Sequence, residues 1–325
     1  MAQLALARAL DPGWLDALFE KHRQRQYTRD LMFSSVVDLM TTVAVGLQPS
    51  VHAAAQARKD LPVSLAALYG KINKTEPSLA RALVAGSAER LAPVAKEIRG
   101  KVAPLCPGYR IRVLDGNHLP SSEKRLAPLR SFRGAALPGH SLVVYDPDAG
   151  IVIDLVPCED GHAQERTLMP AILATAQAGE VWIADRNFST TGIFSGWHQR
   201  GAAFIVREHG SSPNPTVRSK LRKVGRVATG TVYEQEVEIG EGESCIMLRR
   251  IEVHLDEETE GGTPSFASSP TCPAPSRPRK LRSSTGVAGP LKACFSGSNQ
   301  CSTARFVPWG IRVPHFSHFR WRFSP

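Results

Sequence analysis

Two short runs of strand-forming residues, each followed by an aspartate, constrain the fold of this chain most. Tyr109–Leu114 leads into Asp115, and Val181–Ala184 leads into Asp185. Runs of this length are typical of the inner strands of an α/β sheet. Open α/β sheets place their ligands beyond the carboxyl ends of such strands. We therefore expect the two strands to bring two carboxylates side by side.

Two neighbouring carboxylates repel each other, and a shared divalent cation relieves that repulsion. Mg²⁺ takes few protein ligands, usually carboxylates, and keeps waters and substrate phosphate oxygens as its other ligands. Paired Mg²⁺ ions stabilise the attacking and leaving oxygens of a phosphoryl displacement. The sequence thus predicts a Mg²⁺ (or Mn²⁺) site at Asp115 and Asp185. A single aspartate after a strand is also explained by turn formation, so the prediction depends on the pair.

Three segments surround these aspartates, and they read VLDGNHL, GHSLVVYDPDAGIVIDLVPCEDGHAQERTLMPAIL and VWIADRNFS. They resemble the catalytic core of insertion-sequence DDE transposases of the IS-four type. The resemblance covers residues 27–257 and is specific within residues 113–208. It implies that Asp115 and Asp185 are the first two metal-binding acids, and that Arg186 and Phe188 are the residues this family shows after its second aspartate.

The same resemblance implies a ribonuclease-H-like core and an activity in cut-and-paste DNA transposition. In that reaction a metal-activated water cleaves DNA at the ends of the element, and the freed 3′-hydroxyl attacks target DNA. The implied partners are DNA ends and target DNA, with a homodimer in the synaptic complex. The third acid of the family, a glutamate within a Tyr-Arg-Glu-Lys signature, has no match in this chain.

The pattern of elements predicts an α/β protein in four parts. Residues 1–104 are expected to form a helical domain, 105–210 the ribonuclease-H-like core, 211–261 a β-rich insertion and 262–325 an unstructured tail. Expected core elements are a hairpin of residues 141–145 and 151–156 and an amphipathic helix over residues 162–177. The expected helix starts are marked by capping residues, namely Asp11, Ser50, Ser64 and Ser78. Pro93 should kink or end the last of these helices near Ala92.

Basic residues leave two interpretations open. The net charge is +10, but residues 263–325 hold nine Lys or Arg and no Asp or Glu, so the rest of the chain is nearly neutral. The loop over residues 119–140 leaves directly from the first aspartate strand. It is either a solvated loop or the place where a DNA backbone lies against the metal site. Its basic residues are Lys124, Arg125, Arg130 and Arg133.

The location is expected to be the bacterial cytosol. The first residues lack the basic segment and long apolar core of a secretory signal. The longest apolar stretch, residues 31–47, carries Asp38 and is short for a membrane span. The six cysteines show neither metal-ligand spacing nor a disulfide pattern, which suits a reducing compartment.

The chain from about Gly262 is predicted to be a frameshift product. From there on the chain has scattered Pro and Ser and, over residues 263–325, no acids. Such a segment buries too little apolar surface to offset the entropy that ordering would cost. With permitted codons, the bases for residues 283–302 read one base earlier are compatible with ELYRRGWPIEGMFQRLESVL. That string holds the Tyr, Arg and Glu of the missing signature, and the flanking stretches also give a strand-like and a helix-like sequence. We infer the loss of one base, or the gain of two, just before Gly262.

Three functional hypotheses follow. The first is a DDE transposase by family, here truncated and inactive because it lacks the third acid. The second is a DNA-binding remnant that keeps the fold without the chemistry. The third is a Mg²⁺-dependent hydrolase of small phosphoesters, for which the sequence offers no glycine-rich phosphate loop.

Overall fold

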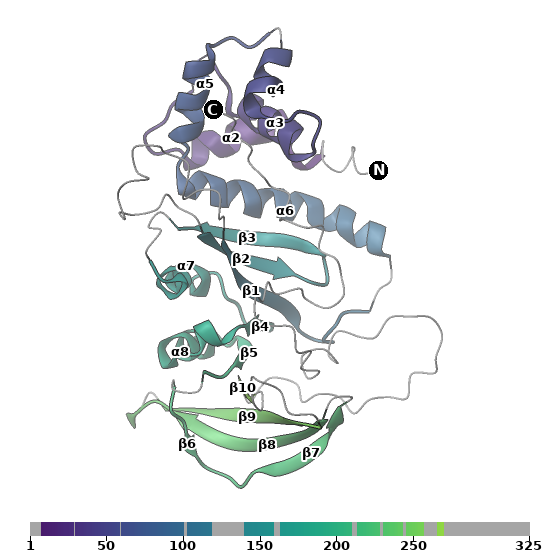
Figure 1. Cartoon of the computed structure of the whole chain (residues 1–325), viewed down its shortest axis with the longest axis vertical. Helices are drawn as coiled ribbons and strands as arrows, with labels where there is room; N and C mark the ends of the chain where they lie inside the picture. Colours follow the sequence, from purple (N-terminus) through teal and green to yellow (C-terminus); the bar gives the residue numbers. More distant parts are fainter. Residues whose placement is uncertain are drawn as a thin grey trace.

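A ten-stranded mixed sheet runs through the middle and lower parts of the molecule in Figure 1, below a group of helices. This arrangement comes from a computed structural model of the 325-residue chain. The structure describes residues 8–28, 30–58, 60–100, 103–118, 140–158, 163–209, 213–227, 230–242, 245–256 and 265–269. The chain is a mixed α/β protein, as the sequence predicts at this level.

The N-terminal helices begin largely where their capping residues predict. They are α2 (Pro12–His22), α3 (Phe33–Ala44), α4 (Val51–Ala57), α5 (Leu65–Asn73) and α6 (Pro77–Arg99). The side chains of Asp11, Ser50 and Ser64 accept hydrogen bonds from the first turns of α2, α4 and α5. Ser78 does not cap α6, because that helix already begins at Pro77, where proline's missing N–H costs nothing.

Pro93 was expected to kink or end helix α6 near Ala92, and the helix does not end there, because it continues through Pro93 to Arg99. Pro93 lies at an exposed position, where water can satisfy the carbonyl that proline leaves without a donor. The helix packs along β3, the first edge strand of the sheet (Figure 1). Arg81 of α6 makes two hydrogen bonds to Asp154 of β3, at 2.9 and 2.7 Å, and fixes the helical region to the sheet.

The first five strands form the part of the sheet that carries the two aspartates. They are β1 (Arg110–His118), β2 (His140–Asp146), β3 (Ile151–Pro157), β4 (Glu180–Ala184) and β5 (Ala203–Arg207). β1, β2 and β3 pair antiparallel, and β4 and β5 run parallel to β1. Their order in the sheet is β3-β2-β1-β4-β5. The predicted hairpin is confirmed as β2 and β3.

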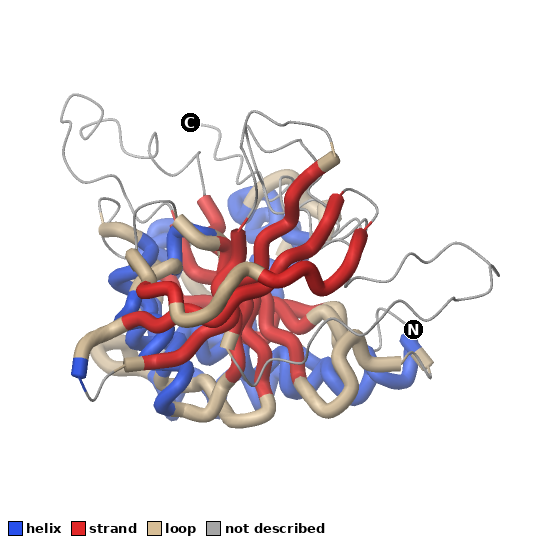
Figure 2. The backbone as a smooth tube through the Cα atoms, turned by 90° about the horizontal axis from the view of Figure 1, so that it is seen from below, coloured by secondary structure: helices blue, strands red, loops and turns tan. Residues whose placement is uncertain are grey.

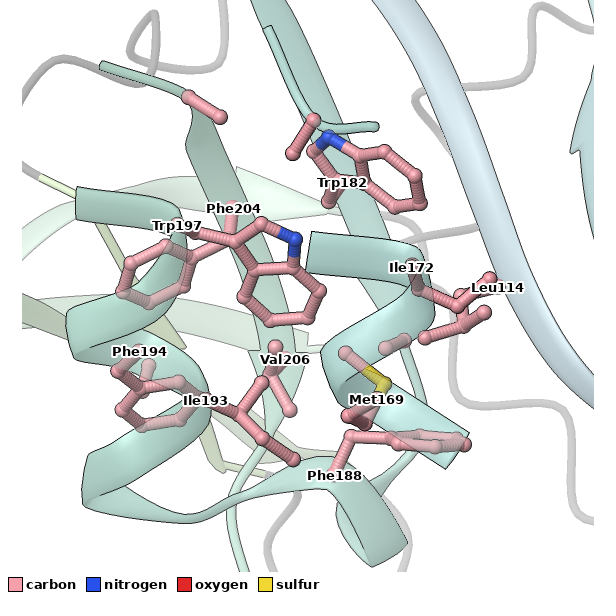
Figure 3. Close-up of a cluster of buried hydrophobic side chains, with 14 of the residues drawn as sticks. Leu114, Met169, Ile172, Trp182, Phe188, Ile193, Phe194, Trp197, Phe204 and Val206 are labelled. Atoms are coloured by element: carbon pink, nitrogen blue, oxygen red, sulfur yellow. The ribbon is translucent and has the colours of Figure 1, made fainter. Parts of the chain in front are cut away.

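Helices on one face of these strands enclose the main apolar core. α7 (Met169–Leu173) and α8 (Thr191–Gln199) contribute the helical side of that core. Figure 3 shows Trp182 and Phe204 of the sheet packed against Trp197 of α8. The helix expected over residues 162–177 is shorter in the described residues: a 3-10 turn, η3 (Glu165–Leu168), comes before α7, and Pro170 sits in the first turn of α7.

The remaining strands extend the same sheet. They are β6 (Thr216–Val217), β7 (Arg222–Val227), β8 (Gly230–Ile239), β9 (Ile246–Leu255) and β10 (Ser265–Ser268). The sheet order continues from β5 through β10, β9 and β8 to β6, while β7 pairs with β8. Figure 2 shows the strands from below as one continuous group. The expected β-rich insertion and the expected core therefore share one sheet.

Strand β10 corrects the prediction that the chain is unstructured from residue 262. Its residues pair antiparallel with β5 on one side and β9 on the other. Ala267, Ser268 and Ser269 are each at most 3% exposed. Backbone ladders do not require large apolar side chains, so composition alone missed this strand. The other residues of the predicted tail lie outside the described residues.

Candidate active site

Asp115 lies in β1, and Asp185 directly follows β4, the parallel strand beside β1. β1 and β4 pair in register up to Leu114 and Ala184, and each aspartate is the next residue of its chain. Adjacent strands lie about 4.8 Å apart, and paired residues of parallel strands point to the same face. The expectation that the strands leading into the two acids are neighbours is confirmed. β1 itself continues past Asp115 to His118, because β2 pairs with it there.

The two aspartates belong to the sheet face opposite the main core. Leu114 and Ala184 both pack into the core with α7 and α8. Val113 and Ile183 belong to a second cluster on the other face. Because side chains alternate along a strand, Asp115 continues the face of Val113. Asp185 has extended backbone angles and continues the face of Ile183 in the same way.

A tight turn fixes the position of Asp185. The residues that follow it form a 3-10 turn, η4 (Arg186–Phe188), in which the Phe188 N–H donates to the Asp185 carbonyl at 3.0 Å. The Phe188 side chain is 1% exposed in the main core (Figure 3). Thr190 then caps α8 by accepting from the Ile193 N–H. The short segment from β4 to α8 is thus fixed at both ends, with Asp185 at its start.

The environment of Asp115 disfavours a negative charge. Burial raises the pKa of its carboxyl to about 7, and the negative charges of Glu165 and Asp185 add to the effect. The Gly116 N–H donates to Asp115 Oδ1 at 2.9 Å and acts in the opposite direction. A bound cation would remove this penalty, because it supplies the positive charge that the carboxylates lack.

Glu165 is a third carboxylate near the pair, and the sequence analysis missed it. A Cβ added to Gly116 would lie 2.0 Å from Glu165 Oε1, so this carboxylate occupies the space that a side chain would fill. Glu165 Oε2 accepts a hydrogen bond from the Asn187 side chain at 2.8 Å. The usable signal was Gly116, because a glycine inside a strand often marks the close approach of another group.

Asp115 and Asp185 are carboxylates, the type of protein ligand that a magnesium ion usually takes. In the part of the chain that the structure describes, no group of three or more His, Cys, Asp or Glu is arranged to hold a metal. Asp115 and Asp185 offer two adjacent carboxylates, and Mg²⁺ is commonly held by one or two carboxylates with waters and substrate phosphates. The two aspartates therefore fit a Mg²⁺ or Mn²⁺ ion.

The other predicted site residues divide into two groups. Arg186 is exposed and directly follows Asp185, at the carboxyl end of β4. The basic loop residues lie outside the described residues, and they are Lys124, Arg125, Arg130 and Arg133. In the hairpin turn, Asp146 Oδ1 accepts a hydrogen bond from the Ala149 N–H at 2.8 Å, and Asp148 accepts one from the Leu105 N–H.

Two basic residues elsewhere in the described part of the chain contact other parts of the protein. Lys71 donates to the Leu31 carbonyl and lies over the Phe19 ring, and burial lowers the pKa of its amine. Arg226 pairs with Asp256 at 2.7 Å on the β7 side of the sheet. These contacts hold both side chains against other parts of the protein.

Comparison of the chain with family models and with curated proteins gave no match. Among the helices that the structure describes, none combines the length and apolar character needed to cross a bilayer.

Proposed function

We propose that this chain derives from a DDE transposase of the IS-four type with a ribonuclease-H-like core. The observation that carries the proposal is the adjacency of Asp115 and Asp185 on β1 and β4. Three antiparallel strands followed by two parallel crossover strands is the ribonuclease-H-like pattern, with the first two acids on neighbouring strands. The resemblance of the surrounding segments supplies the reaction class.

In the proposed site, Asp115 and Asp185 would hold Mg²⁺ or Mn²⁺ at the carboxyl ends of their strands. When bound, the ions supply charge stabilisation and an activated water for phosphoryl transfer on DNA. The chain's own residues then set the geometry: register pairing places the two carboxylates, and the η4 turn orients Asp185. Arg186, exposed directly after Asp185, would contact a DNA phosphate. A DNA strand would approach along the face that bears the two aspartates.

The chain as translated is proposed to be inactive in cleavage. Cut-and-paste transposition in this family needs a third acid, and the sequence carries none in its signature. The competing hypothesis of a DNA-binding remnant gains support from this missing acid. Both hypotheses expect the present chain not to cleave DNA. They differ only in whether a protein made from the restored reading frame cleaves DNA.

Two measurements test the proposal. The nucleotide sequence of the locus should show that the frame shifted before Gly262 is open and encodes the missing glutamate, and stop codons in that frame would exclude the frameshift. The protein made from the restored frame should cleave DNA carrying the element's own ends in Mg²⁺ or Mn²⁺, while the present chain should not. Asp115→Asn or Asp185→Asn should abolish that cleavage and preserve DNA binding.

A structure with Mn²⁺ would test the geometry directly. If the two aspartates share an ion, their nearest carboxylate oxygens should lie roughly 3–6 Å apart, because Mg–O bonds are about 2.1 Å. A separation above about 10 Å would exclude a shared ion. Cleavage of small phosphoesters in the absence of DNA would instead favour the hydrolase hypothesis.

A further inference from the structure

Glu165 approaches the candidate site from the face of the sheet that packs on the main core. Gly116 follows Asp115 in β1, so its missing side chain would point to the opposite face, the face of the main core. Glu165 fills that space with its carboxylate. Glu165 therefore lies on the core-facing side of β1, whereas Asp115 lies on the opposite side.

The same carboxylate also holds the turn that follows the second aspartate. Asn187, two residues after Asp185, donates from its side-chain nitrogen to Glu165 Oε2 at 2.8 Å. One glutamate therefore contacts the residue after Asp115 and bonds to the η4 turn after Asp185. No backbone ladder pairs η4 with β1, because the described pairing of β1 and β4 stops at Leu114 and Ala184.

From this arrangement we infer that Glu165 is a positioning residue, which fixes the η4 turn against β1 and so sets the relative placement of Asp115 and Asp185. The inference rests on the proposed function, because it assigns the positioned pair to a divalent cation. Glu165 acts through its hydrogen bond and its contact with Gly116. Its carboxylate approaches Gly116 of β1, and its charge also acts on Asp115.

The absence of a three-carboxylate metal group among the described residues agrees with a supporting role. A metal ligand must share the space in front of the strands with Asp115 and Asp185, whereas Glu165 already has Asn187 as its partner. Groups that orient metal ligands change metal affinity when they are lost, typically by 10- to 100-fold. A positioning role therefore predicts a measurable effect on binding of the cation.

The first test needs no metal and measures whether Glu165 and Asn187 hold the η4 turn in place; we call this contact the clamp. Hydrogen–deuterium exchange of the full chain reports on the amides of Phe188 and Ser189, which are bonded within η4. Glu165→Ala and Asn187→Ala should both raise exchange at this turn, and the double variant should add little to either. Glu165→Gln should leave exchange near the wild-type rate, since its amide oxygen still accepts from Asn187. Unchanged exchange in both alanine variants would overturn the inference.

The second test measures Mn²⁺ affinity of the same proteins by electron paramagnetic resonance. Glu165→Ala and Asn187→Ala should each weaken binding by roughly tenfold or more, and Glu165→Gln should restore it to within a few fold. Equal weakening by Gln and Ala would overturn positioning and make the charge of Glu165 the important property. If Asp115→Asn and Asp185→Asn leave Mn²⁺ affinity unchanged, the proposed metal site is refuted. The hydrogen–deuterium exchange test would then decide by itself whether Glu165 holds the η4 turn against β1.

A glycine substitution sharpens the test. Gly116→Ala would force the Glu165 carboxylate aside, since its Cβ would lie 2.0 Å from Oε1. It should therefore increase η4 exchange in the wild-type background and have little effect in the Glu165→Ala background. Gly225→Ala is the matched control, because Gly225 also lies in a strand and has open space around its Cβ position. Equal effects of Gly116→Ala in the two backgrounds would contradict the clamp.

Discussion

The carboxylates at the two ends of the β1–β4 pair differ in their partners. At the start of the strands, Arg112 of β1 is 8% exposed and bonds to both Glu180 and Asp146. Glu180 also accepts hydrogen bonds from the Gln177 N–H and the Trp182 indole. At the other end, no described Lys or Arg forms an ion pair with Asp115 or Asp185.

This difference separates structural carboxylates from candidate functional ones. A buried carboxylate with a complete set of partners has no capacity for a ligand, and its loss is expected to affect folding. Asp115 has one N–H donor from the backbone and two negative neighbours, so it is held at a cost to the fold. Strongly shifted carboxyls of this kind are candidates for functional sites.

The largest expected effect comes from removing the arginine of the paired end. Arg112→Ala would leave Glu180, whose side chain is 5% exposed, without its buried cation. Breaking a buried pair from one side costs about 3–5 kcal/mol, and urea denaturation would measure the loss. Arg218→Ala is the control, since its pair with Glu238 involves a half-exposed arginine and should be worth at most about 1 kcal/mol. Equal losses in both variants would remove the contrast between buried and exposed pairs.

At the unpaired end, Asp115→Asn should stabilise the protein above neutral pH. The folded pKa of about 7 exceeds the ordinary value of 3.8, so the wild type loses stability as pH rises from about 4 to about 7. The asparagine variant lacks this loss. Partial exposure reduces the full linkage value, and the gain at pH 8 should be on the order of 2 kcal/mol.

Thermal unfolding at pH 4 and pH 8 in EDTA measures this gain. The difference between Asp115→Asn and wild type should appear at pH 8 and shrink towards pH 4. Millimolar Mn²⁺ should reduce the difference by stabilising the wild type, as the proposed site requires. A variant that is less stable than wild type at pH 8 would contradict the penalty assigned to Asp115.

The smallest effect is expected for Arg110, the outer arginine of the paired end. Its side chain is 55% exposed and lies 3.8 Å from Glu180. Arg110→Ala should therefore change the free energy of unfolding by less than about 1 kcal/mol. The urea midpoint measures this value, and a loss close to that of Arg112→Ala would show that both arginines neutralise Glu180.

Local signals in the sequence predicted much of this fold. Asp11, Ser50 and Ser64 cap helices through hydrogen bonds within three residues, so their role is visible from the sequence alone. The hairpin turn at residues 146–150 follows from turn chemistry in the same way. The adjacency of Asp115 and Asp185 was predictable because each follows a strand-forming run.

Contacts between distant segments were not predictable from such signals. Glu165 lies just before α7 and approaches Gly116 of β1, far from it in the sequence, and no periodicity indicates that contact. β10 was not predicted, because backbone hydrogen bonds between strands can hold small residues as well as large ones. The buried network of Arg112 joins three strands, and a charged residue in an alternating pattern gives no sign of burial.

The central place of β10 also has a consequence for biosynthesis. The ribosome delivers β5 and β9 before β10, and the sheet can close only after residue 268 has emerged. Until then, two long-range pairings are missing and two strand edges lie open to other chains. Newly made copies that stop short of this strand should therefore collect in aggregates or on chaperones, and pulse-labelled truncations ending before and after residue 269 would show the step.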